Sequence, residues 1–164
     1  MTDTHTITNT SATATDPTMA ASTAQFLSPV VMGLEALVVN GKQAHWHVRG
    51  SNFIGVHELL DLIVTHAQEW ADLAAERIVA LVLPVDSRLQ TVAAKAKPTN
   101  VPAAFAQSDV IIRAVIADVD AVLVDLQTAI DGLDETDLAS QDVAIEIKRG
   151  LDKDRWFLFA HVAA

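Results

Sequence analysis

The sequence predicts an all-α fold, a single four-helix bundle with a long connection between its second and third helices. Hydrophobic residues make up 51% of the 164 residues, and the chain has only 6 Gly and 5 Pro, which favours long helices. Apolar residues recur at three- and four-residue intervals along four stretches, which is the period of an amphipathic helix. Cys is absent, which excludes a disulfide framework, a thiolate metal site and a Cys nucleophile.

The first 22 residues differ in composition from the rest of the chain. They are rich in Thr, Ser and Ala and contain no Lys or Arg. They lack the basic start and apolar block of a signal peptide, so cytoplasmic residence is the default expectation. We expect a disordered tail over residues 1–22 and a bundle over residues 23–164. No apolar run reaches membrane-spanning length, so no membrane partner is expected.

The first helix is predicted to begin at Ser28 and Pro29. Ser is a preferred N-cap residue and Pro is favoured at the first helical position, because its missing N–H would have no partner there. The apolar run 30–39 continues the helix as far as His47. Gly50 is expected to end it.

The second helix is predicted to begin after Asn52, which can act as its cap. Its apolar residues keep the helical period from Phe53 to Ile78. Pro84 cannot continue a helix, so the helix is expected to end near Leu83.

The third helix is predicted over residues 109–130. It follows a connector, 86–102, in which a short helix is expected around residues 88–95. Ser108 is its predicted cap, and the dipeptide Asp131-Gly132 is its predicted end.

The fourth helix is predicted to open at Thr136 or Asp137 and to run to about Val162. Two helices, a long crossover with its short helix, and two more helices form the topology of a ferritin-like four-helix bundle.

The second helix carries two pairs of side chains that are suited to a metal ion. His57 precedes Asp61, and Asp72 precedes Glu76, each by four residues, so each pair lies on one face of the helix. The pair centres are about 15 residues apart, or about 22 Å, whereas metal–ligand bonds are about 2 Å long. One straight helix therefore cannot bring both pairs to one metal. Two copies running antiparallel across a two-fold axis would do so.

Two familiar metal motifs are excluded. The Glu-x-x-His motif of classical di-iron bundles does not occur in the chain. The segment 57–61 differs from the zincin motif His-Glu-x-x-His because Asp61 replaces its second histidine. Taken alone, each pair is better explained as solvated groups on a helix surface than as metal ligands.

Four longer motifs follow one another along the first half of the chain. They are Lys-Gln-Ala-His-Trp at 42–46, Arg-Gly-x-Asn-Phe at 49–53, His-Glu-x-Leu-Asp at 57–61 and Asp-x-x-x-Glu-Arg at 72–77. This set resembles the Dps family, the mini-ferritins of bacteria and archaea. The motifs occur in the family's order and register, and the resemblance covers about residues 25–163.

The resemblance implies a ferroxidase centre between two-fold-related subunits. One chain would contribute His45, His57 and Asp61, and its neighbour Asp72 and Glu76; all five residue types are present. It also implies a hollow dodecamer with di-iron sites between subunits, two sites at each dimer interface. These sites would oxidise Fe2+ to Fe3+ with hydrogen peroxide in preference to oxygen, and the ferric mineral would be stored inside. Imidazole and carboxylate ligands suit iron, and other divalent metals as well.

The resemblance also assigns roles outside the ligand set. Trp46 would lie near the centre, where its indole could donate or trap an electron; the alternative is an ordinary packed aromatic residue. Asp118, Asp120 and Asp125 would line a negatively charged pore that concentrates cations, and Asp125 matches the family's acids best. The alternative for these acids is a solvated helix face. His66 is expected to be a packing or surface residue.

The charge of the chain argues against DNA as a partner, despite the DNA binding for which the family is named. The net charge is −10, so twelve chains would carry a formal −120. DNA-binding members commonly use tails rich in Lys and Arg, which residues 1–22 lack. We therefore expect no direct DNA binding at physiological salt.

Two other functions remain open at the level of sequence. Paired interfacial metals could activate water in a metal-dependent hydrolase of amides or esters, such as N-acyl amino acids, with Glu58 or Asp61 as the base. The chain could also form a structural cage without chemistry, which the intact ligand set argues against.

Overall fold

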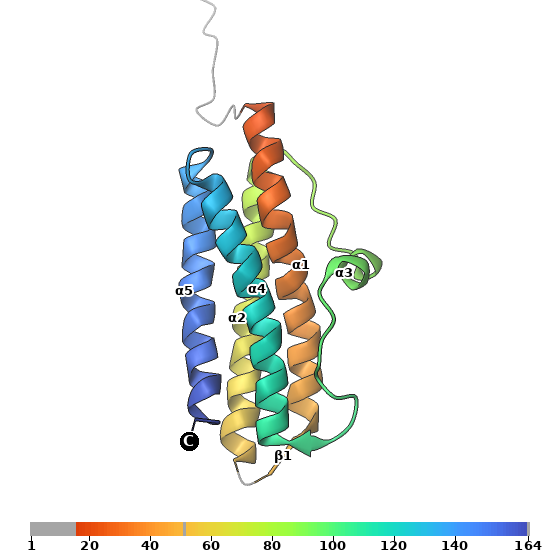
Figure 1. Cartoon of the computed structure of the whole chain (residues 1–164). Helices are drawn as coiled ribbons and strands as arrows, with labels where there is room; N and C mark the ends of the chain where they lie inside the picture. Colours follow the sequence, from red (N-terminus) through yellow and green to blue (C-terminus); the bar gives the residue numbers. More distant parts are fainter. Residues whose placement is uncertain (1–15, 51, 164) are drawn as a thin grey trace, which may run out of the picture.

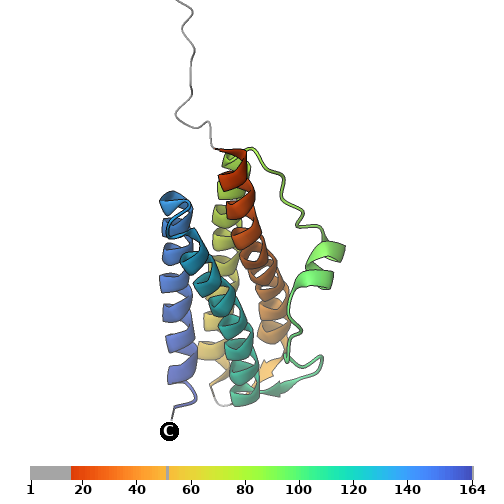
Figure 2. The ribbon, with the colours of Figure 1, turned by 45° about the horizontal axis from the view of Figure 1, so that its top comes forward.

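The structure, a computed structural model, describes residues 16–50 and 52–163. Two antiparallel helix pairs are joined by a long crossover, which confirms the predicted all-α, ferritin-like bundle (Figures 1 and 2). The long helices are α1 (Pro17–His47), α2 (Phe53–Ala80), α4 (Ser108–Leu133) and α5 (Leu138–Ala160). The crossover contains the predicted short helix, α3 (Leu89–Lys95), and ends in β2 (Ala106–Gln107), which pairs in parallel with β1 (Val48–Arg49).

The predicted start of the first helix at Ser28 and Pro29 is wrong. The helix begins at Pro17, and the side chain of Asp16 caps it by accepting a hydrogen bond from the backbone N–H of Thr18 at 2.8 Å. Pro29 lies inside the helix and is exposed to solvent. The dipeptides Asp16-Pro17 and Ser28-Pro29 both combine a preferred N-cap residue with Pro at the first helical position, and the helix begins at the first of them.

Part of the expected tail is therefore helical. Residues 17–22 form the first turns of α1. Packing against the bundle stabilises these turns, because Ala20 is 4% exposed and Thr23 is fully buried. Residues 1–15, for which disorder was also expected, lie outside the described residues.

The turn between α1 and α2 forms close to where it was predicted. Gly50 has a φ of 125°, a conformation that favours glycine. Asn52 occupies the cap position of α2, although its side chain makes no capping hydrogen bond. At its other end α2 stops at Ala80 rather than near Leu83, and Val82 turns the chain with a φ of 64°.

Helix α4 continues past its predicted end to Leu133, and Ser108 is its first residue rather than its cap. The reason is packing, because a Cβ on Gly132 would lie 2.3 Å from Cζ of Phe26 on α1. Gly132 therefore permits close contact between two helices instead of ending one. The N-cap of α5 is Asp137, one of the two residues predicted to open this helix.

Helix α1 is long and apolar enough, by length and composition, to cross a membrane, so the expectation that no run reaches that length is wrong. In the bundle it packs against α2 and α4 and supplies a large share of the core. Its fully buried or nearly buried side chains include Leu27, Val30, Val31, Leu34 and Leu37.

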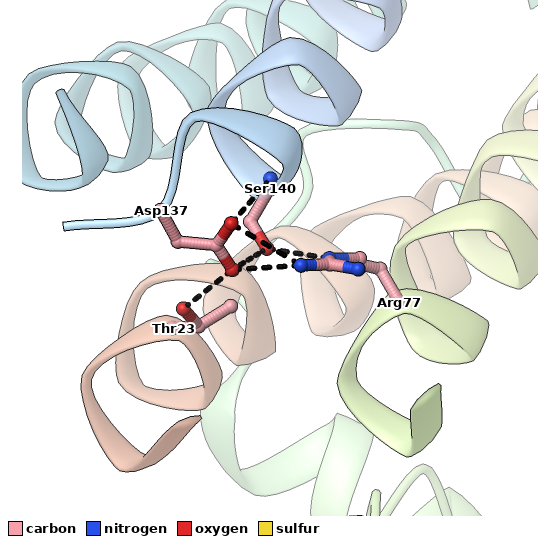
Figure 3. Close-up of polar contacts among 4 residues, drawn as sticks. All are labelled: Thr23, Arg77, Asp137 and Ser140. Carbon is pink, nitrogen blue, oxygen red and sulfur yellow. Dashed lines mark hydrogen bonds and ion pairs between the residues drawn. The ribbon is translucent and has the colours of Figure 1, made fainter. Parts of the chain in front are cut away.

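A buried polar cluster joins α1, α2 and α5 at one end of the bundle (Figure 3). Arg77 Nη2 donates to Asp137 Oδ2 at 2.9 Å, and Arg77 Nε donates to Ser140 Oγ at 2.7 Å. Ser140 Oγ donates to Asp137 Oδ2 at 2.5 Å, and Thr23 Oγ1 donates to the same oxygen at 3.3 Å. The carboxylate that caps α5 is thereby tied to two other helices.

Candidate metal centre

His45 and His57 face each other where α1 meets the start of α2. Their rings are stacked, with centroids 3.6 Å apart and planes 23° apart. His45 Nδ1 lies 2.9 Å from the carbonyl oxygen of His57, and His57 Nδ1 lies 2.9 Å from the carbonyl oxygen of His45. A carbonyl oxygen can only accept, so each Nδ1 carries the proton and each Nε2 keeps a lone pair. This hydrogen bonding of the distal nitrogen is the arrangement that orients metal-binding histidines.

Asp61 adds a carboxylate to the two imidazoles. Its Oδ1 lies 3.9 Å from His45 Nδ1, and its side chain is 54% exposed. The same oxygen accepts a hydrogen bond from Lys42 Nζ at 2.5 Å, and this bond is the largest cause that lowers the pKa of Asp61. Asp61 is therefore ionised and available, but it is held by a side-chain cation.

Asp72 and Glu76 lie on the same side of α2 as His57 and Asp61. The helix is unbroken from Phe53 to Ala80, and at about 100° per residue the four side chains fall within an arc of about 100°. Both acids are exposed, and Asp72 lines an open groove of about 600 Å³ that Glu35 and Glu69 also line. This half of the ligand set therefore faces outward, and residues 16–50 and 52–163 do not cover it.

A single copy does not assemble the five predicted ligands. Asp61 and Asp72 are eleven residues apart on one helix, a rise of about 16 Å. Among the described residues no group of three or more His, Cys, Asp or Glu side chains is placed to hold a metal ion. The structure brings together His45, His57 and Asp61 but leaves Asp72 and Glu76 apart, so a complete site requires a second copy.

Within the described residues, the other predicted site residues make no hydrogen bond or ion pair with these five side chains, although Trp46 directly follows His45 in the chain. Trp46 is 62% exposed on the outside of α1. Asp118 accepts a hydrogen bond from Thr99 and Asp125 one from Lys97, whereas Asp120 pairs with Arg155. A pore would need neighbouring copies, so the pore assignment and the redox role of Trp46 stay predictions.

Sequence reasoning missed two contacts of titratable groups. Lys42 belongs to a quoted motif, but nothing in its spacing marks it as the partner of Asp61. His66 Nδ1 lies 2.9 Å from Oδ2 of Asp154, which is 1% exposed, so His66 is more than a packing residue. Burial raises the pKa of Asp154, and the hydrogen bond from His66 acts in the opposite direction. The partners lie on α2 and α5, too far apart in sequence for any local pattern to connect them.

Known proteins resemble this chain in both sequence and fold. The family model of the ferritin-like domain matches residues 34–164. The DNA protection during starvation protein of Agrobacterium fabrum is 39% identical over 126 residues, which cover 74% of this chain and 75% of that protein. The structure of Dps from Microbacterium arborescens in its high iron form is 69% identical, covers 91% of this chain and 97% of its own, and superposes with a TM-score of 0.89. The chain belongs to the Dps family of ferritin-like proteins. A Dps structure from Mycobacterium smegmatis is also similar, at 28% identity, with 92% of each chain covered and a TM-score of 0.86.

Dps proteins bind and store iron and protect bacterial cells against oxidative stress, and they form oligomeric assemblies. These general properties extend to this Dps chain. They agree with a ligand set that a single copy leaves incomplete.

Proposed function

We propose that this chain is a ferroxidase and iron store that oxidises Fe2+ at centres shared between two-fold-related copies. The observation that carries the proposal is the reciprocal hydrogen bonding of His45 and His57 through their Nδ1 atoms, which in the neutral rings leaves both Nε2 atoms free to bind a metal. The Asp61 carboxylate lies nearby, with Oδ1 3.9 Å from His45 Nδ1. In an antiparallel dimer, Asp72 and Glu76 of the second copy meet this half-site. The 69% identical Microbacterium arborescens protein, described in a high iron form, supports iron as the metal.

The donor set suits iron in both oxidation states. Two neutral imidazoles and three carboxylates balance much of the charge of two iron ions, and carboxylate oxygens accommodate the harder Fe3+. Two Fe2+ ions supply the two electrons that split the O–O bond of hydrogen peroxide, and two protons complete two molecules of water. Both electrons therefore reach peroxide together, without release of hydroxyl radical. The ferric product would be stored as mineral inside a hollow dodecamer.

Exchange of subunits gives the sharpest test of the shared site. One variant carries His57→Ala and Asp61→Ala, and the other carries Asp72→Ala and Glu76→Ala. Metal-free protein is mixed with Fe2+ anaerobically, hydrogen peroxide is added, and ferric absorbance is followed. Each variant alone should oxidise iron no faster than buffer. Co-assembled in equal amounts, they should recover about a quarter of the wild-type centres, because half of the dimers are mixed and each has one intact site.

Three results would overturn the proposal or part of it. Activity in either single variant would mean that these ligands are not required, and no recovery in the mixture would mean that they are not shared. Wild-type oxidation no faster than buffer would reject the ferroxidase itself. Hydrolysis of an N-acyl amino acid that follows metal loading would then favour the hydrolase alternative.

Three further parts of the proposal rest on charge and position. Net charge of −10 per chain would repel DNA, so we expect no mobility shift at moderate salt without divalent cations. Trp46 adjoins His45 and is expected to act as a redox partner, so Trp46→Phe should reduce the protein radical signal after peroxide addition. Cytoplasmic residence stays a prediction that fractionation of the cell would check.

A further inference from the structure

A pocket of about 360 Å³ lies between α1, α4 and the segment of the crossover that follows α3. Figures 1 and 2 show the crossover running along the outer side of α1 before it reaches the start of α4. None of the five predicted metal ligands lines this pocket. Its volume lies in the range of pockets that bind small molecules.

The floor of the pocket is apolar because small residues leave room between the two helices. Met32, Gly33 and Ala36 contribute to it from α1, and Ala121 and Val122 from α4. A Cβ at Gly33 would lie 3.1 Å from Val122 Cγ2, so the absence of a side chain there lets the helices approach. The floor follows α1 at intervals of three and four residues, which gives an elongated shape.

The roof is the crossover, and it is fixed to α4 by side-chain contacts. Lys97 Nζ donates to the carbonyl oxygen of Ala121 at 3.0 Å and to Asp125 Oδ1 at 2.9 Å. Thr99 Oγ1 donates to Asp118 Oδ2 at 2.6 Å and accepts from the backbone N–H of Val101 at 3.0 Å. The pocket is therefore formed before any ligand arrives.

The two carboxylates of the pocket differ in their partners. Asp125 pairs with the Lys97 ammonium. Asp118 accepts a hydrogen bond from the neutral hydroxyl of Thr99, and within the described part of the chain no Lys, Arg or His lies at ion-pair distance from it. Burial raises the pKa of Asp118 more than its neutral neighbours Thr99 and Asn40 lower it. The pocket thus combines an apolar floor with one carboxylate that has no counter-ion.

We propose that this pocket binds a small primary alkylammonium ion, with the ammonium group on Asp118 and the hydrocarbon chain along the floor. The ammonium supplies the positive charge and hydrogen-bond donors that Asp118 lacks. The chain buries apolar surface on the more accessible lining residues Pro29, Ala36 and Ala121, above the buried Met32 and Val122. A bare metal ion fits less well, because it would find one free carboxylate beside apolar side chains.

The methionines allow the test to report on the site itself. The chain has 3 Met, of which Met32 lines the pocket and Met19 lies in the first turns of α1, outside it. The assembled protein, labelled with 13C at the methionine methyl groups, is titrated with n-hexylammonium and separately with 1-hexanol. We expect a saturable shift of the Met32 methyl resonance, no shift at Met19, and binding of hexanol at least tenfold weaker.

Two variants and a control separate this site from general attraction to an acidic protein. Asp118→Asn keeps the shape and the contact with Thr99 but removes the charge, and it should weaken hexylammonium binding at least tenfold. Ala36→Leu fills the pocket and should abolish binding of both compounds. Asp120→Asn removes an equal charge that pairs with Arg155 on α5, and binding should not change.

No saturable shift at Met32, or equal effects of the Asp118 and Asp120 variants, would overturn the proposal. Thermal melting and size-exclusion chromatography verify that each variant folds. If Asp118→Asn does not fold, the Ala36→Leu variant and the comparison of hexylammonium with hexanol test the proposal instead.

Discussion

Lys42 Nζ lies 2.5 Å from Asp61 Oδ1, so a side-chain cation holds the carboxylate that would bind iron. Both side chains are partly exposed, which allows the lysine to leave when a metal ion arrives. Iron must therefore compete with an ammonium group at one ligand of its own centre. The ion pair also keeps Asp61 ionised, because it lowers the pKa of that carboxyl.

Replacement of Lys42 by Met should have two opposite effects. At neutral pH, Fe2+ should bind roughly two- to fivefold more tightly, because an exposed ion pair is a weak competitor. Only as the pH falls toward 3.8 should the gain disappear, because in the variant the pKa of Asp61 returns toward its ordinary value and protons compete at a pH where the paired carboxyl is still ionised. Anaerobic Fe2+ titration from neutral pH down to about pH 3.8 measures both effects. Lys148→Met is the matched control, since Lys148 pairs with Asp152 on α5 at 3.1 Å, and it should leave iron affinity unchanged.

The presence of the four long helices was predictable because helices depend on short-range spacing, whereas the metal-ligand set stays a prediction. The four-residue interval between His57 and Asp61 already fixes a shared face on any helix. The confirmed opening of α5 at Asp137 likewise follows from a local cap. Such features do not depend on contacts with distant parts of the chain.

Features that depend on distant contacts were not predictable. Ser28 and Pro29 form as good a start signal as Asp16 and Pro17, and only the tertiary burial of Thr23 shows which one is used. In the helix, Ser28 Oγ donates back to the Ala24 carbonyl oxygen at 2.6 Å instead of capping. A local sequence pattern cannot show which of two equivalent start signals begins a helix.

Thr65 should mark the centre of the dimer contact on α2. It is exposed and lies on the same arc as the four ligands, about midway between the pairs at His57 and Asp72. A two-fold axis that brings the pairs together therefore passes close to it. Thr65→Arg would place two like charges across the axis, and we expect loss of the dimer together with loss of iron oxidation.

Thr128→Arg is the matched control for Thr65→Arg. Both threonines are exposed and donate from Oγ1 to the carbonyl oxygen four residues earlier, at 3.1 Å for Thr65 and 3.0 Å for Thr128. Sedimentation and ferric absorbance are measured on both variants. A dimer with full oxidation activity in the Thr65 variant would place the axis elsewhere.

Arg77→Met should destabilise the bundle more than loss of any exposed ion pair. It would leave Asp137, which is 8% exposed, buried without its counter-charge, at a cost of about 3 kcal/mol. Burial alone would raise the pKa of Asp137, but the hydrogen bonds from Ser140 and Arg77 outweigh it and hold the pKa below 3.8. The cluster thus stabilises the fold above that pH, and its contribution is lost as the pH falls through the lowered value.

The control for Arg77→Met is Arg155→Met, which breaks the more exposed pair with Asp120 and should cost less than about 1 kcal/mol. Thermal melting at fixed protein concentration compares the two variants with the wild type. Equal shifts in melting temperature would show that the buried cluster contributes no more than a surface pair.

His66 and Asp154 should make the stability of the bundle depend on pH in the opposite direction. Burial raises the pKa of Asp154 above 3.8, so the folded state binds this proton more tightly than the unfolded state does. Relative to Asp154→Asn, the wild type should therefore lose stability as the pH rises from 3.8 through the raised pKa. His66→Ala removes the partner of a carboxyl that is 1% exposed and should cost about 2 kcal/mol at neutral pH.

Melting curves of the wild type, both single variants and the double variant between pH 4 and 8 distinguish a charged pair from simple packing. If charge matters, His66→Ala should be harmful in the wild type and much less so in the Asp154→Asn background, because no buried charge then remains to be paired. Equal losses in both backgrounds would show that His66 acts through its contact with Trp70, whose ring centroid lies 5.3 Å away, rather than through Asp154.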